Sequence, residues 1–183
     1  MPLGEVNRQP HDVTATRLTR ELYGGYGRNY TQTGIYAGQS DYYDGPDRSV
    51  LYADDVDHVD GRWYLSGLWL NGIESVTHDR VTADWEDYIA LPFEARSVNV
   101  VLNPPGVSFD VRVELDGRPL TAGEAGADIE FDSEGHSFFR AYEGRLYGLV
   151  ELPATGRHEL KLSSNSDAFA VFAFTFGVYA DVP

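Results

Sequence analysis

The feature that most constrains the fold is a short aromatic stretch, residues 61–72, which reads G-R-W-Y-L-S-G-L-W-L-N-G. On a β-strand, alternate side chains point to the same side of the sheet. Trp63, Leu65, Gly67 and Trp69 would then share one face of the strand. Two tryptophans on one face either fill the core of a β-sandwich or form an aromatic platform for a ligand. We expect core packing for both, with the platform as the alternative.

From Ser49 onward the chain consists of short β-type runs separated by turn residues, which indicates an all-β protein. The tight-turn pair Asp116-Gly117, between V-R-V-E-L and R-P-L, is typical of a β-hairpin. The expected strands are 49–53, 63–70, 73–77, 87–92, 97–102, 108–115, 128–131, 137–142, 146–151, 158–162 and 168–179. Turns are expected between them, one of them at 154–156. This spacing predicts an all-β, jelly-roll-type β-sandwich.

The N-terminal region does not follow this pattern. Residues 1–18 are polar and aperiodic and predict a flexible arm, so a single sandwich domain is expected over 19–180. A short helix could run from Thr16 to Tyr23 before the glycines that follow. Glycines in Y-G-G-Y-G-R would allow positive φ, and Arg28 at its end could recognise a carboxylate or pair with an acidic strand.

Composition excludes several classes of function. The 183 residues carry 29 acidic and 14 basic side chains, and the net charge of −15 disfavours nucleic acid as a partner. Without cysteine the domain has no disulfide and no thiol chemistry. No apolar run reaches the roughly 18 residues of a membrane span. No export signal is recognisable either, so a cytoplasmic location is expected if the chain is complete, and an extracytoplasmic one if it is a fragment of an exported protein.

Three segments in order resemble a known family. They are T-R-E-L-Y-G-G-Y-G-R (19–28), W-Y-L-S-G-L-W (63–69) and the A-F-x-F-T-F-G pattern ending at Gly177. They look like the C-terminal domain of DipZ-like and related thioredoxin-like proteins, in which a module similar to a carbohydrate-binding module follows a thioredoxin fold. The first 18 residues are too few to hold that redox fold. The resemblance implies an accessory sandwich module without catalytic residues and makes a thioredoxin-like protein one expected partner.

Aromatic residues outside the tryptophan strand are the expected ligand contacts. Tyr36, Tyr42 and Tyr43, with Tyr30, lie in a polar, glycine-rich loop that favours exposure, and Trp85 is flanked by acidic residues. Such rings stack on the faces of sugars while their polar tips form hydrogen bonds. We therefore predict a non-catalytic module that binds a carbohydrate-like ligand. The alternatives are an assembly domain whose aromatic surface contacts a partner protein, and tyrosines that merely hold the loop down.

Two acidic clusters raise the question of a metal. Asp55, Asp57 and Asp60 precede Gly61 and approach a calcium loop, although their spacing is not that of an EF-hand. Asp128, Glu130 and Asp132 would share a strand face. The prediction is a possible structural calcium site at Asp55, Asp57 and Asp60, with a solvated acidic surface as the alternative. The motifs G-x-S-x-G, H-E-x-x-H and the P-loop do not occur, so no enzymatic activity is expected.

Overall fold

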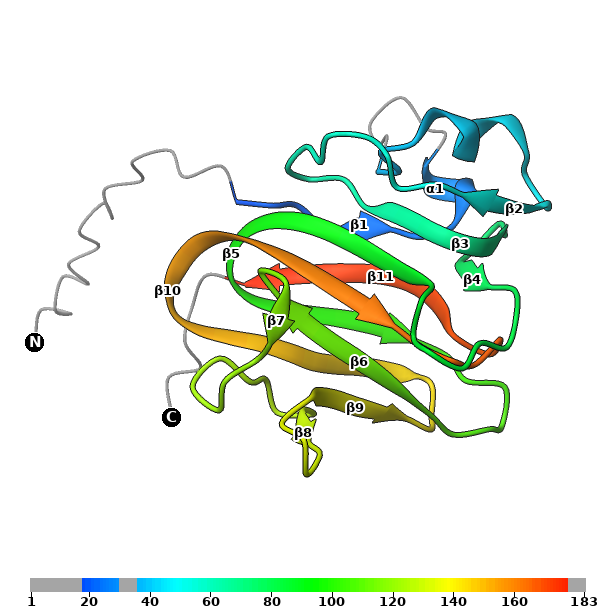
Figure 1. Ribbon diagram of the computed structural model, residues 1–183. Coiled ribbons are helices and arrows are strands. Elements are labelled where there is room, and N and C mark those ends of the chain that lie inside the picture. The colour runs from blue at the N-terminus through cyan, green and yellow to red at the C-terminus, as the bar shows by residue number, and fades with distance from the viewer. Residues whose placement is uncertain (1–17, 30–35, 178–183) are drawn as a thin grey trace, which may run out of the picture.

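The computed structural model describes residues 18–29 and 36–177, which form an antiparallel two-layer β-sandwich (Figure 1). The all-β fold predicted from the sequence is confirmed. Its elements are β1 (Leu22–Tyr23), α1 (Tyr26–Asn29), the 3₁₀ turn η1 (Ser40–Asp44), β2 (Ser49–Tyr52), β3 (Tyr64–Asn71), β4 (Val76–His78), β5 (Tyr88–Leu102), β6 (Phe109–Leu115), β7 (Arg118–Pro119), β8 (Glu130–Phe131), β9 (Ser137–Ala141), β10 (Arg145–Ser163) and β11 (Ala170–Gly177).

Two long strands, β5 and β10, pass through both layers. The first half of β5 pairs with β3 and with the second half of β10, which in turn pairs with β6, and β6 pairs with β9. The second half of β5 pairs with β11 and with the first half of β10. Figure 1 shows both strands bending as they change layer.

The long strands correct two expectations. The runs 87–92 and 97–102 are one strand, and so are 146–151 and 158–162. The turn expected at 154–156 is instead a shift of register in β10, between Glu151 and Gly156. Small and polar residues that are typical of a turn also fit a strand at the point where it bends.

The tryptophan strand packs inward. Trp63, which directly precedes β3, and Leu65 and Trp69 within β3 have no exposed surface. Trp63 Nε1 donates a hydrogen bond to the Tyr23 carbonyl (3.0 Å), and Trp69 Nε1 donates to the Ser66 carbonyl (2.8 Å). Core packing of both tryptophans is therefore confirmed.

The N-terminal expectations need correction. Of the arm expected over residues 1–18, all but Leu18 lies outside the described residues, and so do Thr16 and Arg17 of the expected helix. The rest of the expected helix is irregular chain and strand β1, and the helical turn α1 comes later, at Tyr26–Asn29. The Asp116–Gly117 turn is confirmed, with φ of 53° and 76° at its two residues. Within the described part of the chain, no helix is long and apolar enough to cross a membrane.

Candidate functional site

The three described loop tyrosines are part of the packing. Tyr42 has no exposed surface, stacks edge-on against Trp63 (4.9 Å between ring centroids) and donates from its hydroxyl to the Gly24 carbonyl (2.9 Å). Tyr36 is 8% exposed, and Tyr43 is half-buried with its hydroxyl on the Ala37 carbonyl (3.1 Å). The expected exposure is thus wrong for Tyr36 and Tyr42, because these rings seal the edge of the core. Tyr30 lies outside the described residues.

The acidic loop 53–61 contacts β5 through Asp54 and β10 through His58. Asp55 and Asp57 are exposed, and Asp60 accepts a hydrogen bond from Thr19 (3.3 Å). In the described residues, three potential metal ligands come within 4.8 Å of one another at only one place, Asp132, Glu134 and His136. Calcium binding by Asp55, Asp57 and Asp60 therefore stays a prediction.

His58 fastens this loop. Its ring lies 2.7 Å from carboxylates of both Asp54 and Glu159, and it stacks on the Tyr64 ring at 4.1 Å. Burial lowers the pKa of His58, but the hydrogen bonds to Asp54 and Glu159 outweigh it, so the net pKa is raised.

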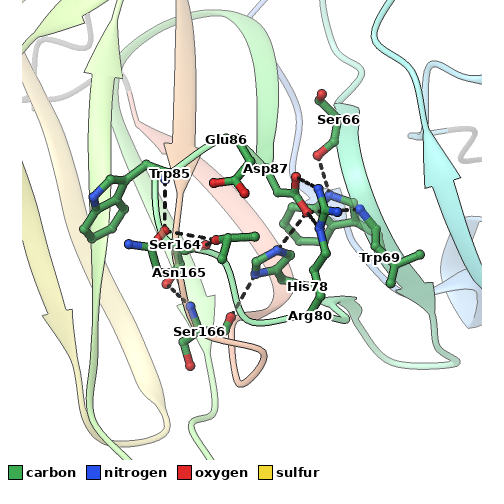
Figure 2. Close-up of polar contacts among 12 residues, drawn as sticks. Ser66, Trp69, His78, Arg80, Trp85, Glu86, Asp87, Ser164, Asn165 and Ser166 are labelled. Atoms are coloured by element: carbon green, nitrogen blue, oxygen red, sulfur yellow. Dashed lines mark hydrogen bonds and ion pairs between the residues drawn. The ribbon is translucent and has the colours of Figure 1, made fainter.

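A buried polar cluster lies behind the tryptophan strand (Figure 2). Asp87, 2% exposed, accepts hydrogen bonds from Arg80 Nε (2.6 Å) and Nη2 (2.5 Å), His78 Nε2 (3.0 Å) and the Leu68 amide (3.1 Å). His78 has no exposed surface, and its Nδ1 contacts the Ser166 carbonyl (2.9 Å). The Asp87 carboxylate thus accepts four hydrogen bonds, two of them from the Arg80 guanidinium.

The glycine of the tryptophan motif makes room for this cluster. Gly67 has φ of +97°, and a Cβ there would collide with the Asp87 carboxylate. Burial raises the pKa of Asp87, but the hydrogen bonds from Arg80, Leu68 and His78 outweigh it, so its net pKa is lowered. The carboxylate is consequently held in its charged form.

The cluster anchors one end of the loop 79–87, which carries Trp85. Trp85 has φ of 59°, a left-handed conformation that is unfavourable for a bulky residue. Asn165 holds it: its side-chain oxygen accepts from the Trp85 amide (3.0 Å) and the Thr82 hydroxyl (3.0 Å), and its amide nitrogen donates to the Ala83 carbonyl (3.2 Å). Figure 2 shows the indole pointing away from Asp87 and Arg80. The loop therefore presents Trp85 in a fixed, half-buried position.

Trp85 extends a sheet face that combines rings and charges. We call the side of β5, β10, β6 and β9 opposite the core the outer face. The Arg112 guanidinium lies 4.5 Å from the Trp85 ring centroid, and the Lys161 ammonium lies 5.2 Å from that of Tyr88. The register of the strands places the side chains of one transverse row in the order Tyr88, Ser163, Arg112 and Phe138.

Charged groups on the outer face are partly neutralised by neighbouring side chains. Lys161 pairs with Glu114 (2.5 Å), and both remain about one-third exposed. The Tyr88 hydroxyl donates to Asp54 (2.7 Å), and burial together with this acceptor raises the pKa of Tyr88 to about 12. The face therefore offers aromatic surface, hydrogen-bond donors and a carboxylate within a small area.

Of the four predicted ligand-binding residues, only Trp85 belongs to the outer face. Among the described residues, the side-chain and backbone contacts of Trp85 are with Arg112 and Asn165, and none joins it to Tyr36, Tyr42 or Tyr43. Sequence reasoning missed Tyr88, Arg112, Phe138 and Lys161, because they lie on four separate strands. The signal that could have identified them is the alternation along β5, β6, β9 and β10, which points their side chains away from the core.

Comparison with known proteins identifies the family of the chain. No curated protein matches the chain. Among solved structures, a family two carbohydrate esterase from Clostridium thermocellum in complex with cellohexaose is similar, with a TM-score of 0.40 and 18% identity. That similarity covers 60% of this chain but 30% of the esterase chain, and is too low to bear on function. The family model for the thioredoxin-like C-terminal domain matches residues 19–177. Because that match takes in nearly the whole described fold, this chain belongs to the family of thioredoxin-like C-terminal domains.

Proposed function

We propose that the domain is a non-catalytic accessory module that binds a carbohydrate-like ligand on its outer face. The observation that carries the proposal is the Trp85 loop. Its backbone conformation costs about 1–3 kcal/mol for a residue of this kind, yet Asn165 and the buried Asp87 cluster hold it in place. Strain of this kind accumulates where a side chain must be presented in one position.

The chemistry of the outer face suits a sugar. The Trp85 and Tyr88 rings provide surfaces on which the C–H face of a pyranose can stack. Arg112, Lys161 and Glu114 supply donors and an acceptor for hydroxyl groups. Because the net charge of −15 repels polyanions, we expect a neutral polysaccharide.

Affinity electrophoresis tests this proposal. The domain is run in native gels that contain a soluble neutral glucan, xylan or mannan, and at least one of them is expected to retard it. Trp85→Ala should abolish that retardation. Tyr142→Ala is the matched control, since Tyr142 is 53% exposed and also carries an arginine over its ring, at the end of β9 away from the outer-face row. Circular dichroism establishes that each variant is folded.

Two results would overturn carbohydrate binding. One is a native domain that no polysaccharide retards; the other is a Trp85→Ala variant retarded like the native chain. Light scattering separates the alternative of an assembly domain. In that case the native protein is an oligomer, and Trp85→Ala converts it to a monomer without any effect of polysaccharide.

A further inference from the structure

Arg112 is a cation on the outer face that has no acidic partner in the described part of the chain, and this bears on the ligand of that face. The Arg112 side chain is half-buried, and its guanidinium lies over the Trp85 ring, 4.5 Å from the centroid. A guanidinium has five N–H donors, and none of those of Arg112 donates to a described residue.

The register of the sheet explains why Arg112 has no partner. Ser163 on β10 and Phe138 on β9 stand directly opposite Arg112, and neither carries a charge. Asp110 and Glu114 are its neighbours along β6, and because side chains alternate along a strand, both point to the same side as Arg112. These two acids are therefore the groups of the sheet from which a partner would come.

Both of these acids are engaged by other cations. Arg140 stands opposite Asp110 and pairs with it (2.8 Å), and Lys161 stands opposite Glu114 and pairs with it (2.5 Å). Among these three cations of the outer face, Arg112 is the one whose charge no described acidic side chain neutralises.

The acids of the Trp85 loop do not neutralise Arg112 either. The Asp84 side chain is exposed, and the Glu86 carboxylate accepts a hydrogen bond from the Asp84 amide (3.0 Å). Across residues 18–29 and 36–177, neither acid forms an ion pair with Arg112.

The surroundings of the guanidinium favour a carboxylate from a ligand. Trp85 and Phe138 are half-buried rings beside it, so solvent reaches it from fewer directions than it reaches an open surface. Charges attract more strongly where water is partly excluded. The planar fork of a guanidinium also matches a carboxylate with two parallel hydrogen bonds. A sugar stacked on Trp85 would bring its substituents within reach of this fork.

We propose that the ligand of the outer face is a neutral polysaccharide that carries isolated uronic acid residues, and that Arg112 binds their carboxylate. This inference rests on the proposed function, because Trp85 must hold the sugar that brings the carboxylate to Arg112. The acids are isolated, since the net charge of −15 repels a chain that is charged at every sugar. Arg112 is then the residue that determines specificity for the acid.

Affinity electrophoresis with matched polymers tests the proposal. A xylan substituted with glucuronic acid is compared with the same polymer after its carboxyl groups have been reduced to alcohols. Neutral glucan and mannan are each compared with a form lightly oxidised to uronic acid at the primary hydroxyl. For the polymer that retards the native domain, the acidic form should bind about tenfold more tightly than the neutral form, as expected for a charge-assisted hydrogen-bonded pair.

Variants of the arginines separate binding from packing. Arg112→Gln should bind the acidic form no more tightly than the neutral form, and Arg112→Lys, which keeps the charge, should retain part of the preference. Arg140→Gln is the matched control: it removes the same charge from the same face, but Arg140 is already paired with Asp110. This control should prefer the acidic form like the native chain. An Arg112 that only positions the Trp85 ring would affect both forms equally when it is replaced.

The outcomes distinguish this inference from the proposed function. If the native domain binds no polymer of either form, both are overturned. If it binds the neutral and acidic forms equally, or if Arg112→Gln keeps the preference, the role of Arg112 is rejected and carbohydrate binding stands. Tighter binding of a uronic acid homopolymer than of the sparsely charged polymers would also reject it.

Discussion

Removing the buried carboxylate of Asp87 should destabilise the domain strongly. In Asp87→Ala, the Leu68 amide and the His78 imidazole lose their acceptor inside the protein, whereas Arg80, 41% exposed, can turn to water. Each buried donor left without a partner costs about 1–3 kcal/mol. With the cavity that truncation leaves, the loss is about 3–5 kcal/mol, the range measured when one member of a buried ion pair is removed. For a chain of this length, this lowers the melting temperature by roughly 6–20 °C.

Urea unfolding at pH 7, followed by circular dichroism, measures the effect. Asp84→Ala is the control, because Asp84 lies in the same loop with an exposed side chain. The lowered pKa of Asp87 also predicts how its effect on stability depends on pH. The stabilisation by Asp87 is fully present above the unfolded-state pKa of about 4 and is lost as pH falls through the folded-state pKa. The difference between native chain and variant should therefore shrink in acid. A variant within about 1 kcal/mol of the native chain at pH 7 would refute the role assigned to Asp87.

Three further predictions concern the loops. Trp85→Gly should be about 1 kcal/mol more stable than Trp85→Ala, since glycine relieves the positive φ, and equal denaturation midpoints would contradict this. The raised pKa of His58 means that its contribution is present below about pH 6.5 and is lost as pH rises through the folded-state pKa. The stability difference between the native chain and His58→Gln should therefore be larger at pH 5.5 than at pH 8.5, and a difference independent of pH would exclude this linkage. Calcium at Asp55, Asp57 and Asp60 predicts a melting temperature that falls when a chelator is added, and an unchanged value rejects it.

Much of the fold could be predicted because buried residues recur in the sequence in a local, alternating pattern. Alternation correctly assigned Trp63 and Trp69 to the core, and Asp116-Gly117 correctly marked a tight turn. The boundaries of strands were harder to predict where one strand runs through both layers. The bend of β10 near Gly156 has the composition of a turn, yet its backbone stays paired with β5 on both sides.

The candidate site could be predicted only in part. Trp85 was recognisable as an aromatic residue in a polar loop, and the structure places it on the outer face. The same criterion failed for Tyr42, because a glycine-rich, polar neighbourhood says nothing about a ring that folds back onto Trp63. The roles of Arg112 and Lys161 could not be predicted from the local sequence, because each is brought to its aromatic partner by the pairing of distant strands.

The tryptophan strand is more than a scaffold, although its rings face the core. Gly67, between the two tryptophans, provides the space that the Asp87 carboxylate occupies, and Asp87 fixes the end of the loop that presents Trp85. The residues that anchor this loop, His78 and Asp87, are buried, while most of those between them are exposed. Apart from Arg80, which pairs with Asp87, the exposed residues can therefore be substituted to alter the outer face at little cost in stability. A side chain at position 67 would instead disturb the core and the presentation of Trp85 together. If Trp85 binds a ligand, Gly67→Ala should weaken the binding although Gly67 is not part of the binding surface. Gly67 is therefore the residue of the tryptophan motif through which the fold supports the function.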